Sequence, residues 1–250
     1  MGRLAPRRLG TIALVTALTI TTVACGAERG DRTSPTTLPA ATTAATASLV
    51  DSARLESALL RPSDLPQGFD VETRGDASEA GSTPLTAVDP ACQPALDELA
   101  PDHGSGAMKL PHAEVGYQRA RTVQVGHQLA VSPDAVERFR NARRTLTAAC
   151  GRKVVFRTDG GGGRYVLRRG PRMGTEAIYL RSHLETRVAD APATVDGFLV
   201  FVRIGDVVSV VSVHTSSIPQ LGINPRRAPR FVEAVLLARR ATMRLRRALR

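Results

Sequence analysis

Apolar and polar residues alternate along much of the second half of the chain, which is the pattern of half-buried β-strands. Gly205 and Asp206 separate the last two alternating runs. They predict a two-residue hairpin turn, because glycine accepts the positive φ that such a turn requires. The pattern therefore predicts a series of strands joined by short connections. These strands cover residues 114–120, 121–131, 153–157, 165–169, 176–188, 197–204 and 207–214.

Helical spacing of apolar residues occurs in four places. Short helices are expected within 49–60 and 90–99. Ser132-Pro133-Asp134 predicts the start of a third helix running to Cys150, because a hydroxyl cap, a proline and an acid suit the first turn. A fourth helix begins near Ala228 and carries an apolar stripe on one side. That stripe comprises Phe231, Val235, Ala238, Thr242, Leu245 and Leu249.

Together these elements predict an α+β fold. Strands connected by hairpins form an antiparallel sheet, and the amphipathic helices need a sheet face on which to bury their apolar sides. Residues 49–250 are enough for one domain with its own core. The prediction is a single α+β domain in which an antiparallel sheet packs against several helices.

The N-terminus has the features of a lipoprotein signal peptide over residues 1–24. Three arginines precede an apolar run, residues 10–24, that is too short to span a bilayer comfortably. The run stops at Cys25, which we expect to carry the lipid after cleavage; the alternative is an ordinary signal peptide with Cys25 as a bystander. Residues 25–48 are rich in Thr, Ala, Ser and Pro and predict a flexible tether to the membrane.

Two further cysteines, Cys92 and Cys150, lie within the predicted domain. Outside the cytoplasm an isolated pair in one domain is most simply a disulfide, with metal binding or free thiols as the alternatives. We therefore expect one disulfide, Cys92–Cys150, joining the helix near Cys92 to the end of the helix that starts at Ser132.

The excess positive charge of the chain lies at its C-terminus. The whole chain has 34 basic and 23 acidic residues, and residues 226–250 hold nine arginines and one acid, Glu233. Arg240, Arg244 and Arg247 fall opposite the apolar stripe of the final helix. They are either solvated surface residues or a contact for anionic lipid headgroups or another acidic partner.

The sequence contains no pattern that predicts catalysis or metal binding. The five histidines lack H-E-x-x-H spacing, and Ser105 lacks the strand and helix of a nucleophile elbow. Glycines 160–163 are not followed by the Lys-Ser/Thr of a phosphate loop, so they predict a slack hairpin loop. No catalytic residue, metal ligand or cofactor is predicted. Nucleic acid is not an expected partner, because the chain is exported and poor in aromatic residues for base stacking.

Several motifs occur in an order typical of one group of proteins. Leu59-Leu-Arg-Pro-Ser-Asp-Leu-Pro-Gln-Gly-Phe69 is followed by Ala91-Cys92, by Ala149-Cys150 at a helix end, by Met173-Gly-Thr-Glu-Ala177 and by the hairpin at 202–207. Over roughly residues 55–241 the chain resembles actinobacterial lipoproteins of the PknH-type sensor-domain group. The resemblance implies an extracytoplasmic α+β domain that binds a ligand and has no established catalytic residues.

Three functions compatible with these features remain open. The first is a membrane-anchored, non-catalytic module that binds or senses a small molecule, a glycan or a protein. The second is a lipid carrier, for which the apolar run 198–213 could line a cavity, although that run fits a buried central hairpin better. The third is an envelope enzyme of unknown type.

Overall fold

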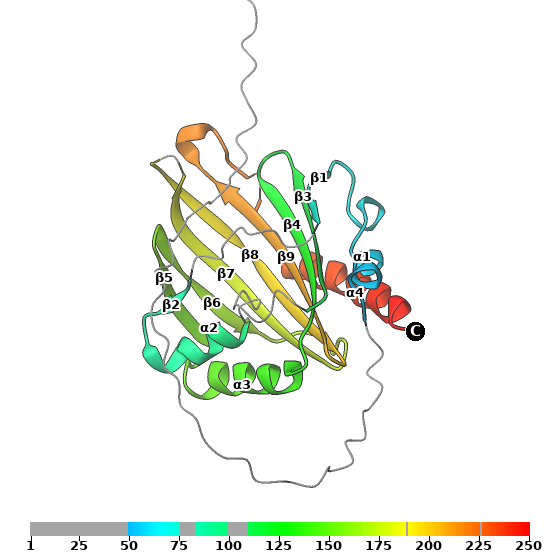
Figure 1. Ribbon diagram of the computed structural model, residues 1–250. Coiled ribbons are helices and arrows are strands. Elements are labelled where there is room, and N and C mark those ends of the chain that lie inside the picture. Colours follow the sequence, from blue (N-terminus) through cyan, green and yellow to red (C-terminus); the bar gives the residue numbers. More distant parts are fainter. Residues whose placement is uncertain (1–49, 76–83, 100–109, 189, 226) are drawn as a thin grey trace, which may run out of the picture. The chain divides into compact units, whose positions relative to one another are not determined.

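The computed structural model describes residues 50–75, 84–99, 110–188, 190–225 and 227–250 (Figure 1). The predicted signal peptide (1–24), the candidate lipid-bearing Cys25 and the predicted tether (25–48) lie outside the described residues. Ser105 and most of its loop also lie outside them. In the part of the chain that is described, none of the helices combines the length and the apolar character needed to cross a bilayer.

A nine-stranded antiparallel sheet is the central element of the described chain. Its strands lie in the order β1-β3-β4-β9-β8-β7-β6-β5-β2, so β8 is central, with β7 and β9 beside it (Figure 1). Most neighbours in the sheet are also neighbours in sequence, because hairpins connect them. The strands are β1 (Asp70–Gly75), β2 (Thr86–Ala87), β3 (His112–Arg119), β4 (Val123–Val131), β5 (Lys153–Thr158), β6 (Gly161–Arg168), β7 (Glu176–Val188), β8 (Ala191–Ile204) and β9 (Val207–Ser217).

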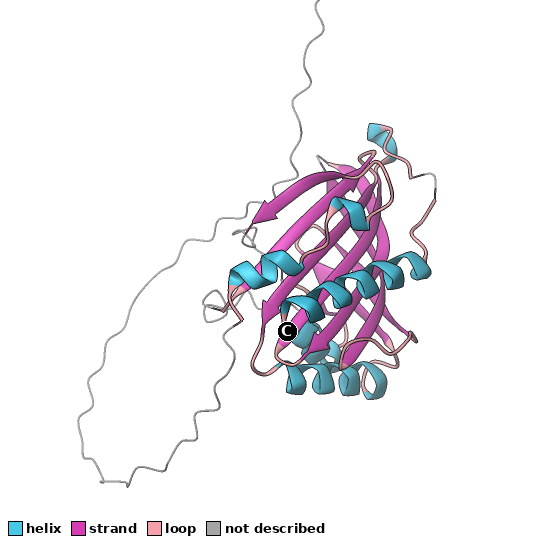
Figure 2. Cartoon of the chain, turned by 90° about the vertical axis from the view of Figure 1, so that its right-hand side faces the viewer, coloured by secondary structure: helices cyan, strands magenta, loops and turns pink. Residues whose placement is uncertain are grey.

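Helices cover both faces of this sheet. α1 (Ser52–Ala58) and α4 (Phe231–Ala248) pack on one side, which we call the α4 face (Figure 2). α2 (Gln93–Leu99) and α3 (Ala135–Ala148) pack on the opposite side, the α3 face (Figure 1). Three short 3-10 turns complete the description: η1 (Pro62–Asp64), η2 (Pro90–Cys92) and η4 (Pro219–Leu221).

The alternating pattern of β8 explains how the sheet serves two cores. Val200 and Val202 are fully buried on the α4 face, whereas Phe201 between them is buried with α2 and α3. Successive side chains of a strand point to opposite faces, so one apolar strand can contribute to both cores. The run 198–213 is thus the central hairpin of the sheet, as the sequence pattern favoured.

Most predicted elements are present, with differences at the glycine-rich and polar ends. Residues 161–163 were expected in a loop but belong to β6, and the turn falls at Asp159 and Gly160. A Cβ at Gly161 would collide with the backbone of Glu185 in β7, so the absence of a side chain is what lets these two strands pair. Strand β8 also starts six residues earlier than the apolar pattern indicates, because its polar first half pairs with β7. The short strands β1 and β2 have no predicted counterpart.

The predicted disulfide between Cys92 and Cys150 is confirmed, with the two Cα atoms 5.5 Å apart. It joins the last residue of η2 to the second residue after the C-terminal end of α3. Since Cys92 directly precedes α2 and Cys150 follows α3, the bond holds these two helices together on the α3 face. It closes a loop across a sequence separation of 58 residues, which restricts the unfolded chain. The structure is therefore the expected single α+β domain, with an antiparallel sheet, several helices and one disulfide.

Candidate functional site

The three arginines predicted as a membrane contact do not share one environment. Arg244 was expected to point away from the packed side of α4, and this is wrong: its side chain is only 19% exposed. Its guanidinium group donates to the carbonyl oxygens of Leu59 at 2.7 Å and Ser57 at 3.0 Å. The reason is that α1 packs beside α4 and covers this flank of the helix. Arg240 is exposed and donates to the Asp64 carbonyl, and Arg247 is exposed with no side-chain hydrogen bond to a described residue.

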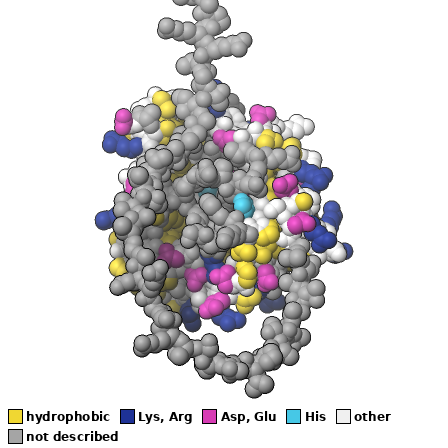
Figure 3. Space-filling view, viewed as in Figure 1, with side chains coloured by type: hydrophobic (Ala, Val, Ile, Leu, Met, Phe, Trp, Pro, Cys, Tyr) yellow, Lys and Arg dark blue, Asp and Glu magenta, His cyan; other side chains and the backbone are white. Residues whose placement is uncertain are grey.

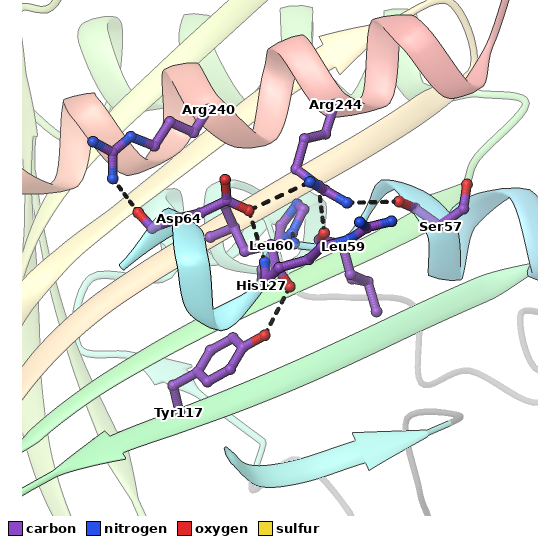
Figure 4. A network of polar contacts seen from close by, with 9 residues as sticks. Ser57, Leu59, Leu60, Asp64, Tyr117, His127, Arg240 and Arg244 are labelled. Atoms are coloured by element: carbon purple, nitrogen blue, oxygen red, sulfur yellow. Dashed lines mark hydrogen bonds and ion pairs between the residues drawn. The ribbon is translucent and has the colours of Figure 1, made fainter. Parts of the chain in front are cut away.

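A buried polar network surrounds the backbone of Leu60, where the chain leaves α1 (Figure 4). The Leu60 amide donates to Nδ1 of His127 in β4 at 3.0 Å, and its carbonyl accepts from the Tyr117 hydroxyl of β3 at 2.8 Å. Arg244 adds an ion pair to Asp64 with the two charged groups 3.6 Å apart. The start of the motif at residues 59–69 is therefore anchored by side chains of the sheet and of α4.

His127 and Ser209 lie in hydrogen-bond contact but are not arranged for nucleophilic catalysis. His127 Nε2 lies 3.0 Å from Ser209 Oγ. Because Nδ1 must accept from the Leu60 amide, the ring proton must be on Nε2, so the ring cannot take a proton from the serine. Both side chains have no solvent exposure, and burial, followed by the charge of Arg244, lowers the pKa of His127 to about 3. The pair is a structural contact.

A different arrangement occurs on the α3 face, where five polar side chains lie in one row that crosses six strands. The row comprises Tyr165, Ser182, His214, Gln124 and Gln118, and we call it the polar row. Gly197 occupies the position between Ser182 and His214. Residues directly opposite one another in paired strands lie on the same face, so these side chains are neighbours. A Cβ at Gly197 would collide with the His214 ring, which shows that the ring lies over this glycine.

The polar row makes no side-chain hydrogen bond with any described residue. Ser182 Oγ is buried and has no hydrogen-bond partner, which in a native fold is uncommon and costs on the order of 1–3 kcal/mol. Burial lowers the pKa of His214 to about 4, so its ring is neutral near neutral pH. Burial also raises the pKa of Tyr165 to about 12, so the phenol keeps its proton. The row thus presents neutral donors and acceptors without internal partners.

Apart from Asp70 of β1, which pairs with Gln118 at the exposed end of the row, the neighbours of the polar row are uncharged. Two residues along each strand in one direction, the positions on the same face are Leu180, Leu199, Ser212 and Gly126. Two residues in the opposite direction, the positions on this face are Gly163, Leu184, Val195 and Ser216. Figure 3 views the molecule from the α3 face, and histidine side chains are visible near the middle of the described surface. A ligand that offers hydroxyl groups together with an apolar face matches this chemistry better than a charged one.

No arrangement for metal binding is found among the residues that the structure describes. The histidine with the closest carboxylates is His183, whose Nδ1 lies 2.9 Å from Asp196 and whose Nε2 lies 3.2 Å from Glu185. Hydrogen bonds to Asp196 and then to Glu185 raise the pKa of His183. This group is a partly exposed ion pair, and within the described chain its ring contacts no hydroxyl or thiol that could act as a nucleophile.

Neither the buried network nor the polar row was predicted from the sequence. His127 and His214 both occupy alternating positions in predicted strands, and neither lies in a motif that indicates metal binding or catalysis. A signal for the polar row was present in the polar positions of three strands. It could not be used, because only the register of β4, β9 and β7 brings those positions together.

Comparison with known proteins supports the fold. No protein-family model and no curated protein matches the chain. The structure is similar to the crystal structure of the extracellular domain of PknH from Mycobacterium tuberculosis, with a TM-score of 0.51 and 13% sequence identity. The match covers 79% of this chain and 97% of that domain. The resemblance to the PknH-type sensor-domain group is therefore confirmed at the level of the fold, while lipoprotein character and actinobacterial origin stay predictions.

The contrast between Arg244 and Arg247 can be tested by stability measurements. We expect Arg244→Gln to lower the free energy of unfolding by about 1–3 kcal/mol, because it removes the donor to the part-buried Leu59 carbonyl and leaves Asp64 without its cationic partner. Arg247→Gln in the same helix is the matched control and should change it by less than about 0.5 kcal/mol. Urea denaturation of both variants gives these values, and equal stabilities would contradict the structural role of Arg244.

The burial of His127 predicts a loss of stability in acid. The unfolded chain takes up a proton on this ring below pH about 6.5, whereas the folded chain resists protonation down to pH about 3. The free energy of unfolding should therefore fall as the pH is lowered from about 6.5 toward about 3. His127→Gln should be less stable at neutral pH but should show a shallower acid dependence. Both proteins keep His183 and His214, so a parallel pH profile would mean that His127 titrates normally.

Proposed function

We propose that this protein is a lipid-anchored, extracytoplasmic binding or sensing module without catalytic activity. Its ligand is a neutral, hydroxyl-bearing molecule such as a glycan or polyol, bound over the polar row of the α3 face. One observation carries the proposal: five neutral polar side chains line up across the sheet, and the buried Ser182 hydroxyl among them has no partner. A bound hydroxyl group would supply that partner.

The proposed location is supported by three independent features. The sequence has a signal peptide pattern that ends at Cys25, and the domain contains a disulfide, which is typical of exported proteins. Its fold is similar to that of a domain described as extracellular. A lipid on Cys25 and the tether predicted for residues 25–48 would hold the ligand-binding domain near the outer side of the membrane.

The structure also bears on how such a site could bind without catalysis. The row offers hydrogen-bond donors and acceptors that are neutral near neutral pH, because burial lowers the pKa of His214 and raises that of Tyr165. Neither group is poised near neutral pH, where a general acid or base works best. These groups are suited to orienting a ligand by hydrogen bonds, with the flanking leucines providing apolar contact.

The anchor is tested by Cys25→Ala in the intact precursor. Without the thiol there is no site for the lipid, so the variant should leave the membrane fraction or accumulate as an uncleaved precursor. Cell fractionation followed by mass determination separates these outcomes from wild type. A mature-sized variant that still fractionates with membranes would show that the anchor lies elsewhere.

Ser182→Ala provides a sharp test of the polar row. Since the hydroxyl has no partner, its removal should leave the unliganded protein as stable as wild type or more stable. The thermal shift caused by a ligand should be reduced or lost. Neutral mono- and disaccharides, maltooligosaccharides and inositol are suitable probes, followed by calorimetry on any that raise the melting temperature of wild type.

Ser209→Ala is the matched control for this experiment. Its hydroxyl contacts His127 on the opposite face, so the variant should melt at a lower temperature yet keep the full ligand-dependent shift. A ligand that shifts wild type and Ser182→Ala equally would exclude the polar row as its site. If no neutral, hydroxyl-bearing probe shifts wild type, the proposed ligand class is wrong.

A further inference from the structure

The outward side of α4 carries apolar residues that no other described element covers. Val232, Leu236 and Met243 are 53%, 49% and 52% exposed, respectively. Their spacing places them on one stripe of the helix, since residues four and seven apart lie on the same side. The opposite side of α4 is the one buried against the sheet. This helix therefore has two apolar sides, of which only one contributes to the core.

Arginines lie on the same outward stripe. Arg239, Arg247 and Arg250 are exposed and make no side-chain hydrogen bond or ion pair with a described residue. Arg250 follows the C-terminal end of α4, and at about 100° per residue Arg239 and Arg247 fall within about 20° of the stripe of exposed apolar residues. Arg246 also lies there and only just reaches the Gly174 carbonyl, at 3.5 Å. Apolar and cationic side chains thus share one outward surface, which we call the α4 outer surface.

This surface has no acidic group of its own to neutralise it. The acid of α4, Glu233, lies in its first turn and is paired with Arg227 at 2.7 Å and Arg230 at 3.1 Å. Beside α4, Asp51 caps α1 through the Arg54 amide, and Asp64 forms an ion pair with Arg244. The segment that holds Asp51 and Glu56 also holds Arg54 and Arg61, so its net charge is zero. The surplus charge of the α4 outer surface is therefore available to an anionic partner.

The chain also enters the domain beside this helix. The described residues begin at Val50, which packs with the α4 face core, and α1 then runs alongside α4 (Figure 2). The predicted tether joins the domain at this point. Because the tether joins the domain on the face that carries α4, it would not have to pass around the sheet for α4 to contact the membrane.

We propose that the α4 outer surface docks on an anionic lipid bilayer. Val232, Leu236 and Met243 insert at the level of the headgroups, and Arg239, Arg247 and Arg250 bind lipid phosphates, for which the guanidinium group is well shaped. Arg244 has no part in this contact, because it is engaged with α1. The proposal goes beyond the ligand-binding function and does not depend on it, since the polar row lies on the opposite face of the sheet.

The test uses residues 26–250, made without a lipid. This chain keeps both cores and both cysteines, all of which lie at or beyond Val50, so every contact described above is retained. Binding is measured by co-sedimentation with vesicles of equimolar phosphatidylglycerol and phosphatidylcholine, and with vesicles of phosphatidylcholine alone. We expect binding to the anionic vesicles that weakens at high salt, and much weaker binding to the neutral ones.

Two sets of substitutions separate the contributions of charge and apolar surface. Replacing Arg239, Arg247 and Arg250 with glutamine should weaken binding to anionic vesicles on the order of ten-fold or more. Leu236→Gln with Met243→Gln should also weaken it while leaving the charge unchanged. The matched control replaces Arg140, Arg157 and Arg187, exposed arginines of α3, β5 and β7, and should bind nearly as wild type does.

Three results would overturn the proposal. Equal binding of wild type to anionic and neutral vesicles would exclude recognition of anionic headgroups. Equal loss of binding in the α4 triple variant and the control triple variant would mean that only the net charge of the protein matters. Self-association of wild type in sedimentation, abolished by the Leu236 and Met243 substitutions, would assign the surface to a second copy of the chain. None of these results depends on whether a glycan binds the polar row.

Discussion

The structure depends on hydrogen-bond partners for the buried backbone between α1 and η1. Leu59 and Leu60 pack their side chains into the core beneath α4, which takes their amide and carbonyl groups away from water. His127, Tyr117 and Arg244 provide the missing partners from two strands and a helix (Figure 4). Because a buried charge on His127 would be costly, the ring stays neutral and the arrangement of α1, α4 and the sheet is tied to its protonation state.

The two faces of the sheet are used in different ways. On the α4 face the polar groups near α1 are paired, and the surrounding side chains form a continuous apolar core. On the α3 face the disulfide holds α2 and α3 over part of the sheet, and the side chains of the polar row make no hydrogen bonds with one another. Polar side chains are therefore paired within the fold on one face, and those without partners lie on the other.

Arginines in the last helix illustrate how one sequence feature can serve separate purposes. Arg244 donates to two carbonyls of α1 and stabilises the fold. Arg247, three residues later, lies on the outward side with the exposed Met243. Residues three apart on a helix differ by about 60° in direction. Arg244 therefore points toward α1, whereas Arg247 points outward, where an external partner can reach it.

The sequence by itself determined the elements and the fold class. Alternation predicted the strands from β3 to β9, and the two cysteines predicted a disulfide that the structure contains. Ser132-Pro133-Asp134 located the start of α3 approximately, but the N-cap residue is Asp134, and the Ser132 hydroxyl donates to its carboxylate instead of capping the helix. These features depend on local spacing or on simple pairing. Tertiary structure alone decided that Ser182, His214 and Gln124 share a row, that His127 is a buried acceptor, and that Arg244 points inward. Strand register and the placement of α1 beside α4 arise from contacts between distant segments, which the spacing of residues along one segment does not encode.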